Sequence, residues 1–88
     1  MVNVGRGPTV VDDALVAALR EERLGFAALD VFADEPNVPQ DFFDLEDKLI
    51  LQPHQASATH DTRRAMSQLC MDNVRAFLDG SAPLTPVP

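Results

Sequence analysis

The stretch Phe26-Ala27-Ala28-Leu29-Asp30-Val31-Phe32 is the segment from which the fold can be worked out. It is a nearly continuous apolar run, and such a run directly after a helix is typical of a strand buried in a parallel sheet. Asp30 is the exception, because a carboxylate inside an apolar strand is costly unless it is paired or hydrogen-bonded. We therefore expect Asp30 either to bond a neighbouring backbone or to face a ligand.

A strand and a helix are predicted upstream of this run. Residues 1–4 read as half a strand, and Gly5-Arg6-Gly7-Pro8 ends it in a turn. Alanine and leucine side chains recur at helical spacing over residues 12–23, and Arg and Gly residues close that segment. Asp12 is the expected N-cap of this helix.

A loop, a strand and a second helix are predicted downstream. Residues 33–48 are rich in Asp, Glu, Pro and Asn and indicate a long loop with a turn of helix at 41–45. Residues 48–52 form a short strand, and a helix runs from an N-cap at Thr59 to Gly80. We expect Cys70 on this helix to be part of the core, and Met66 and Met71 to have packing roles as well. A mostly apolar seam at helical spacing runs along the helix: Met66, Leu69, Cys70, Asn73, Val74 and Phe77.

The predicted element order is β–α–β–loop–β–α, which places the chain in the α/β class with a parallel sheet. Residues 1–80 are expected to belong to one domain, followed by an extended tail at 81–88. Three parallel strands leave a bare edge, and parallel sheets are normally covered by helices on both faces. The order of elements therefore suggests that part of the fold is missing.

Composition excludes several classes of function. The 88 residues include 14 acidic and 7 basic side chains, a net charge of −7, which argues against nucleic-acid binding. No apolar run is long enough for a membrane span, and no signal peptide is evident. The single cysteine excludes an internal disulfide, and no His/Asp/Glu spacing indicates a metal site. We expect a soluble, cytoplasmic protein.

Candidate functional side chains follow each predicted strand. Arg6 follows the first strand; Asp30 lies at the end of the second, with Asp34 and Glu35 just beyond; His54 follows the third. Ligands of parallel α/β sheets bind at the carboxyl ends of strands, so these groups could meet in one cleft. Each also has a structural interpretation: a surface arginine, a structural histidine, or solvated loop charges. Spacing alone does not choose between Asp34 and Glu35.

Several motifs in the right order resemble a known family. Val2–Gly7, Val10–Asp12, Ala27–Pro36 and Gln52–Thr59 together resemble the C-terminal part of the NAD(P)-dependent D-2-hydroxyacid dehydrogenases. Thr59–Met66 looks most like the glyoxylate/hydroxypyruvate reductase branch. The resemblance implies a partial Rossmann-like sheet, namely the C-terminal half of a dinucleotide-binding domain plus a terminal helix. It also implies that the chain is a C-terminal fragment.

The resemblance assigns roles to individual residues. It places the family's catalytic arginine, glutamate and histidine on Arg6, Glu35 and His54, and so selects Glu35 over Asp34. It implies that Arg6 and His54 contact a small 2-keto or 2-hydroxy acid. It implies that NAD or NADP contacts a longer set of residues: Val4, Gly5, Arg6, Asp30, His54, Ala56 and Ser57.

The implied reaction is chemically sensible. The guanidinium of Arg6 suits the carboxylate of a 2-keto acid. His54 would donate a proton to the ketone oxygen as hydride arrives, and Glu35 would orient the imidazole and favour its charged form. Gly5-Arg6-Gly7 lacks the pattern of a dinucleotide phosphate loop, so the isolated chain is expected to be nearly inactive.

Two functions therefore remain open from the sequence. The first is a fragment of a 2-keto acid reductase. The second is a non-enzymatic module derived from the same family, which would self-associate as a homo-oligomer or swapped assembly, or bind a partner chain. The joint presence of Glu35 and His54 favours the enzyme, because an interaction module does not need both.

Overall fold

The computed structural model describes residues 1–88, which form two compact units, Met1–Ala56 and Ser57–Pro88. The division falls between the third strand and the long helix. The expected single domain over residues 1–80 stays a prediction. None of the helices combines the length and apolar character that crossing a bilayer requires.

The first unit is built on a three-stranded parallel sheet. Its strands are β1 (Val2–Asn3), β2 (Ala27–Leu29) and β3 (Leu49–Leu51), in the order β1-β2-β3. This confirms the α/β class and the parallel topology. The central strand is shorter than its apolar run, because beyond Asp30 the backbone leaves the ladder. There the N–H of Phe32 donates to a side chain, Glu35, instead of to a strand.

The connection from β1 to β2 contains a 3-10 turn, η1 (Gly7–Thr9), and the helix α1 (Asp12–Arg20). The predicted N-cap was wrong by one residue, because Val11 occupies that position and Asp12 lies in the first turn. The helix also stops three residues earlier than predicted. The backbone of Glu22 adopts a φ of 57°, a left-handed conformation that cannot continue a right-handed helix.

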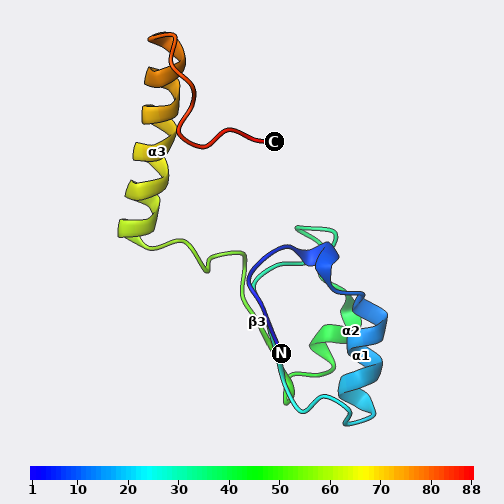
Figure 1. Cartoon of the computed structure of the whole chain (residues 1–88). Coiled ribbons are helices and arrows are strands. Elements are labelled where there is room, and N and C mark those ends of the chain that lie inside the picture. Colours follow the sequence, from blue (N-terminus) through cyan, green and yellow to red (C-terminus); the bar gives the residue numbers. More distant parts are fainter. The chain divides into compact units, whose positions relative to one another are not determined.

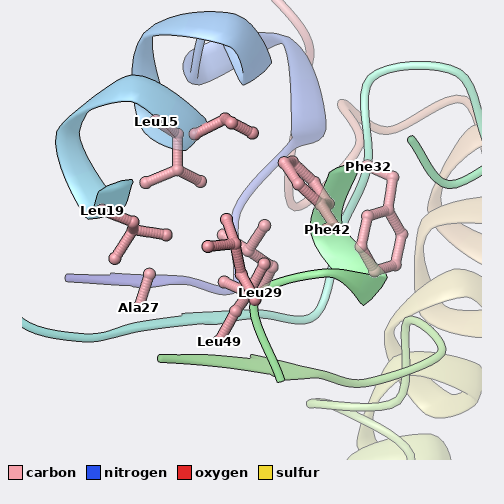
Figure 2. Packing of buried hydrophobic residues seen from close by; sticks show 9 residues of the cluster. Leu15, Leu19, Ala27, Leu29, Phe32, Phe42 and Leu49 are labelled. Carbon is pink, nitrogen blue, oxygen red and sulfur yellow. The ribbon is translucent and has the colours of Figure 1, made fainter. Parts of the chain in front are cut away.

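The hydrophobic core lies on one face of the sheet. The helix α1 and the short helix α2 (Gln40–Phe43) cover this face (Figure 1). Figure 2 shows Leu15 and Leu19 of α1 above the side chains of β2 and β3. Phe42 of α2 lies at one end of this hydrophobic core. The opposite face carries an in-register row, Val2, Ala28 and Ile50, and both outer members of this row are exposed.

The second unit consists of α3 (His60–Leu78) and the residues after it. The Oγ1 atom of Thr59 accepts a hydrogen bond from the Thr62 N–H at 3.2 Å, which confirms the predicted N-cap. Gly80 has a φ of 75°, which fits its predicted place just beyond the helix. The tail folds back, since the N–H of Thr85 donates to Asn73 Oδ1 at 3.1 Å (Figure 1).

The predicted core role of Cys70 on the α3 seam was wrong. Cys70, Met66 and Met71 are all exposed, and no residue of α3 is buried. Only the returning tail accompanies α3 within its unit, and a single helix cannot bury its own apolar stripe.

Candidate active site

The sheet order brings the ends of the three strands to one rim. Arg6 follows β1, Asp30 follows β2 and His54 follows β3, and the three strands are parallel neighbours. The N–H of Asp30 donates to Asn3 O at 2.9 Å, which fixes the alignment of the first two strand ends. The predicted meeting of these side chains at one edge of the sheet is therefore present in the first unit.

Glu35 and His54 form the closest contact of this rim. Glu35 Oε2 lies 2.7 Å from His54 Nδ1, and Glu35 Oε1 accepts the N–H of Phe32 at 2.9 Å. The hydrogen bond from His54 lowers the pKa of Glu35. The Phe32 N–H and the positive charges of His54 and Arg6 lower it further. Glu35 is thus held ionised, and it fixes the imidazole with Nδ1 turned toward the carboxylate.

Arg6 lies close enough to influence Glu35 but forms no ion pair with it. Its Nη1 donates to its neighbour's carbonyl, Gly5 O, at 2.6 Å, and no carboxylate of the chain lies within salt-bridge distance. An exposed guanidinium without a carboxylate partner retains donors for an anionic ligand.

Asp30 holds the turn that carries His54. Its Oδ1 and Oδ2 accept the N–H groups of Gln55 and Ala56 at 2.7 and 2.8 Å. Burial raises the pKa of Asp30, but these N–H donors and the charge of His54 outweigh it, so the pKa lies below its usual value. Of the two roles left open for Asp30, backbone bonding is the one that the structure contains.

The hydrogen bonds from Asp30 act on an unusual backbone. His54 has a φ of 54°, in the left-handed region that few residues other than glycine adopt. Strained conformations of this kind persist where surrounding contacts enforce them, and they cluster at functional sites. The two N–H bonds to Asp30 are such contacts, because they fix the two residues directly after His54.

Asn3 is a supporting residue that the sequence analysis missed. Its Nδ2 donates to Arg6 O and to Thr9 Oγ1, both at 3.2 Å, and its Oδ1 accepts the Gly5 N–H at 3.1 Å. The last bond is a side-chain contact to the backbone two residues on, a habit of Asn in turns that could have identified it. Asn3 is one of two buried polar residues, with Asp30, and each braces one turn of the rim.

Gly7 allows the turn after β1 to touch the next segment of the rim. A Cβ atom at Gly7 would lie 1.9 Å from the carbonyl carbon of Phe32 and 2.0 Å from its oxygen. No side chain fits there, so the glycine is required for close approach. This contact sets the turn that carries Arg6 directly against the segment that leads to Glu35.

A cleft of about 340 Å³ opens beside the two paired side chains. Its walls are mostly apolar, and its polar members are Glu35, His54 and Gln52. The lining residues are Phe32, Glu35, Pro36, Val38, Phe43, Leu51, Gln52, Pro53 and His54.

The remaining predicted site residues are exposed. Val4 and Gly5 lie on the turn after β1, and Ala56 lies just after His54. Ser57 is exposed and belongs to the second unit. Their contacts with a cofactor stay predictions.

Comparison with known proteins gives a family match. The family model of the D-isomer specific 2-hydroxyacid dehydrogenase, NAD binding domain, matches residues 1–56, which is the whole of the first unit.

Individual relatives agree with this match. Glyoxylate/hydroxypyruvate reductase A of Arabidopsis thaliana is 49% identical, and hydroxyphenylpyruvate reductase of Plectranthus scutellarioides is 48% identical. Each match covers 99% of this chain and 28% of the relative. The crystal structure of an NADPH-dependent glyoxylate/hydroxypyruvate reductase from Sinorhizobium meliloti, with NADP and malonate, is 48% identical with a TM-score of 0.88. This match covers 98% of the present chain and 27% of the chain of the Sinorhizobium reductase. The chain thus spans little more than a quarter of its relatives' length.

Proposed function

This chain belongs to the D-isomer specific 2-hydroxyacid dehydrogenases, through their NAD binding domain, and from that premise we propose that it serves the reduction of a 2-keto acid. The proposed substrate is a small acid of the glyoxylate or hydroxypyruvate type, and the product is a D-2-hydroxy acid. The proposed catalytic residues are Arg6, Glu35 and His54.

The contact between Glu35 and His54 is the observation that carries this proposal. The 2.7 Å hydrogen bond at Nδ1 leaves His54 Nε2 as the ring nitrogen that can face a ketone oxygen. Glu35, held ionised, stabilises the imidazolium that donates the proton. Arg6 binds the carboxylate of the same substrate through its unpaired guanidinium.

NADH or NADPH would supply the hydride for this reaction. The rim suits the nicotinamide end of such a cofactor, because the turns after β1 and β3 are exposed there beside the paired side chains. The residues proposed to lie along it are Val4, Gly5, Arg6, Asp30, His54, Ala56 and Ser57. No glycine-rich phosphate loop occurs within the 88 residues, so the pyrophosphate must be held by other groups.

A chimera tests the proposed function. The segment of the Arabidopsis reductase that matches this chain, 28% of that protein, is replaced by residues 1–88. We expect the chimera to reduce glyoxylate or hydroxypyruvate. Substitution His54→Gln is expected to lower kcat by roughly 100-fold or more, since it removes a general acid. His60→Gln is the matched control. A folded chimera without activity, or one that is indifferent to His54→Gln, would contradict the proposal.

The isolated chain should bind NADH and NADPH weakly. Because its 88 residues contain no phosphate loop, a fluorescence titration with either nucleotide is expected to show no saturation at micromolar concentration. Saturation in that range would contradict the assignment of the pyrophosphate site to residues outside this chain.

A second candidate function is a self-associating module, and the bare face of the sheet favours it. Val2, Phe26 and Ile50 are 72%, 67% and 60% exposed. Parallel sheets are normally covered on both faces, so another copy or a partner chain could bind here. Light scattering is expected to show a dimer or larger assembly that Ile50→Lys dissociates. A cooperatively folded monomer of the unmodified chain would count against this candidate.

A further inference from the structure

The carbonyl oxygen of Arg6 accepts hydrogen bonds from two side chains, although Arg6 lies on an exposed turn. Oγ1 of Thr9 donates to it at 2.6 Å, and Nδ2 of Asn3 donates to it at 3.2 Å. The backbone N–H of Thr9 donates to the same oxygen at 3.2 Å. Nδ2 of Asn3 also donates to Oγ1 of Thr9 at 3.2 Å, so this hydroxyl uses its donor and its acceptor capacity together.

The guanidinium of Arg6 is docked on a peptide group that lies between these bonds. Its Nη1 donates to Gly5 O at 2.6 Å. The peptide before this carbonyl is held at the Gly5 N–H, which donates to Asn3 Oδ1 at 3.1 Å, and the peptide after it is held at Arg6 O. Since the neighbouring peptides are fixed on both sides, Gly5 O has a defined position, and it offers the guanidinium a defined acceptor.

A threonine hydroxyl that bonds the carbonyl three residues back is a common local feature of turns. Two further observations distinguish Thr9. Its hydroxyl is joined to Asn3, which is a buried side chain anchored in β1. The carbonyl that it holds belongs to an arginine whose guanidinium has no carboxylate partner and so retains donors for an anion.

We propose that Thr9 is a positioning residue for Arg6, because its hydroxyl fixes the backbone of Arg6 and thereby holds the guanidinium in place before a carboxylate binds. This inference rests on the proposed function, since it takes the guanidinium as the group that binds the carboxylate of the 2-keto acid. Thr9 itself touches neither substrate nor cofactor. A guanidinium that is ordered in advance loses less conformational freedom on binding, and the affinity for the carboxylate is correspondingly higher.

The variant Thr9→Val, made in the chimera described above, tests the effect on the reaction. It replaces the hydroxyl with a methyl group of similar size. Loss of the hydrogen bond is expected to raise the KM for glyoxylate roughly threefold to tenfold. We expect kcat and its pH dependence to stay unchanged. Arg6 holds the carboxylate in the ground state and in the transition state alike, and the contact between Glu35 and His54 does not involve Thr9.

The order of the guanidinium is measured directly on the 88-residue chain. The ¹H–¹⁵N heteronuclear NOE of Arg6 Nε reports motion on the picosecond to nanosecond timescale, and we expect it to fall in Thr9→Val. Thr9→Ser keeps the hydroxyl and is expected to restore both the NOE and the KM. A purely structural role of Thr9 would lower the melting temperature without this selective change in KM.

Thr85→Val is the matched control. Oγ1 of Thr85 accepts Nδ2 of Asn73 at 2.9 Å, so the same pair of side-chain types is hydrogen-bonded in the second unit. This pair makes no hydrogen bond to Arg6. Thr85→Val should therefore leave the KM for glyoxylate and the NOE of Arg6 Nε unchanged.

The outcomes separate this inference from the proposed function. In an active chimera that responds to His54→Gln, an unchanged KM in Thr9→Val overturns the inference, and so does a fall in kcat at constant KM. An unchanged NOE of Arg6 Nε overturns it as well. If the chimera is inactive or indifferent to His54→Gln, the proposed function fails, and the NOE alone decides whether Thr9 orders Arg6.

Discussion

Glu35 and His54 are 19 residues apart in the chain, yet their side chains meet at 2.7 Å through Oε2 and Nδ1. The second carboxylate oxygen of Glu35 accepts the backbone N–H of Phe32, so the carboxylate is anchored by the backbone as well as by the imidazole. The orientation of the ring is thus set by the backbone through Glu35. This makes the tautomer of His54 a measurable property of the fold.

Removal of Glu35 should change that tautomer. The hydrogen bond places a proton on Nδ1 of the neutral ring, because the partner of one ring nitrogen determines where the proton lies. In Glu35→Ala we expect the ¹⁵N shifts of His54 to move toward those of an unpaired imidazole, measured above pH 8. His60 is the internal reference, since its ring makes no hydrogen bond. Identical His54 shifts in both proteins would contradict this prediction.

Substitution of Gly7 should disrupt the rim. In Gly7→Ala the new methyl group would overlap the backbone of Phe32, with a carbon–carbon distance of 1.9 Å. Backbone cannot move aside as a side chain can, so we expect a large fall in the melting temperature of the first unit. Circular dichroism measures it. The matched control is Gly25→Ala, because a Cβ at Gly25 meets nothing within 4 Å. Equal melting temperatures in the two variants would contradict this prediction.

The sequence was sufficient for the topology and for the side chains of the rim. The apolar run around Leu29 and the strand–helix–strand order determine a parallel sheet, and a parallel sheet places Arg6, Asp30 and His54 at one edge. These inferences depend only on local pattern and on handedness. They hold in the structure even though each strand is shorter than the range predicted for it.

The sequence was insufficient where a residue's role depends on a contact far along the chain. Nothing local to Asp30 indicates that its oxygens bind Gln55 and Ala56, which lie 25 and 26 residues away. Burial of Cys70 on the α3 seam failed as a prediction for a similar reason. Periodicity shows that Phe77 and its neighbours share a face, but it does not show that another element covers that face.

The core of the first unit should be sensitive at Leu19. This side chain belongs to α1, is fully buried and is part of the core cluster, so Leu19→Ala leaves a cavity. Such substitutions cost about 2–5 kcal/mol of the free energy of unfolding. For a domain of this size that corresponds to a fall in melting temperature of roughly 10 °C or more. Leu78→Ala, at a position 76% exposed, should change the melting temperature little. If Leu19→Ala lowered the melting temperature no more than Leu78→Ala does, Leu19 would not belong to the core.

The stability of the first unit should depend on pH in the acid range. The hydrogen bond from His54 and the N–H of Phe32 lower the pKa of Glu35, and the pKa of Asp30 is also lowered. A carboxyl group with a lowered pKa in the folded state binds fewer protons there than in the unfolded chain. Its stabilising contribution is complete above the ordinary pKa, 4.5 for Glu35 and 3.8 for Asp30. That contribution is lost as the pH falls through the folded value.

Urea titrations between pH 7 and pH 3 measure this dependence. We expect the free energy of unfolding to fall steeply below about pH 4.5, because two groups then take up protons on unfolding. Asp12 opposes the trend, since burial and the charge of Asp13 raise its pKa. The double variant Asp30→Asn, Glu35→Gln should be less stable at pH 7 and should show a shallower slope. The control Glu46→Gln, at an exposed position, should keep the original slope. If the double variant keeps that slope too, these two carboxylates do not carry the acid sensitivity, and their hydrogen bonds do not hold the rim together.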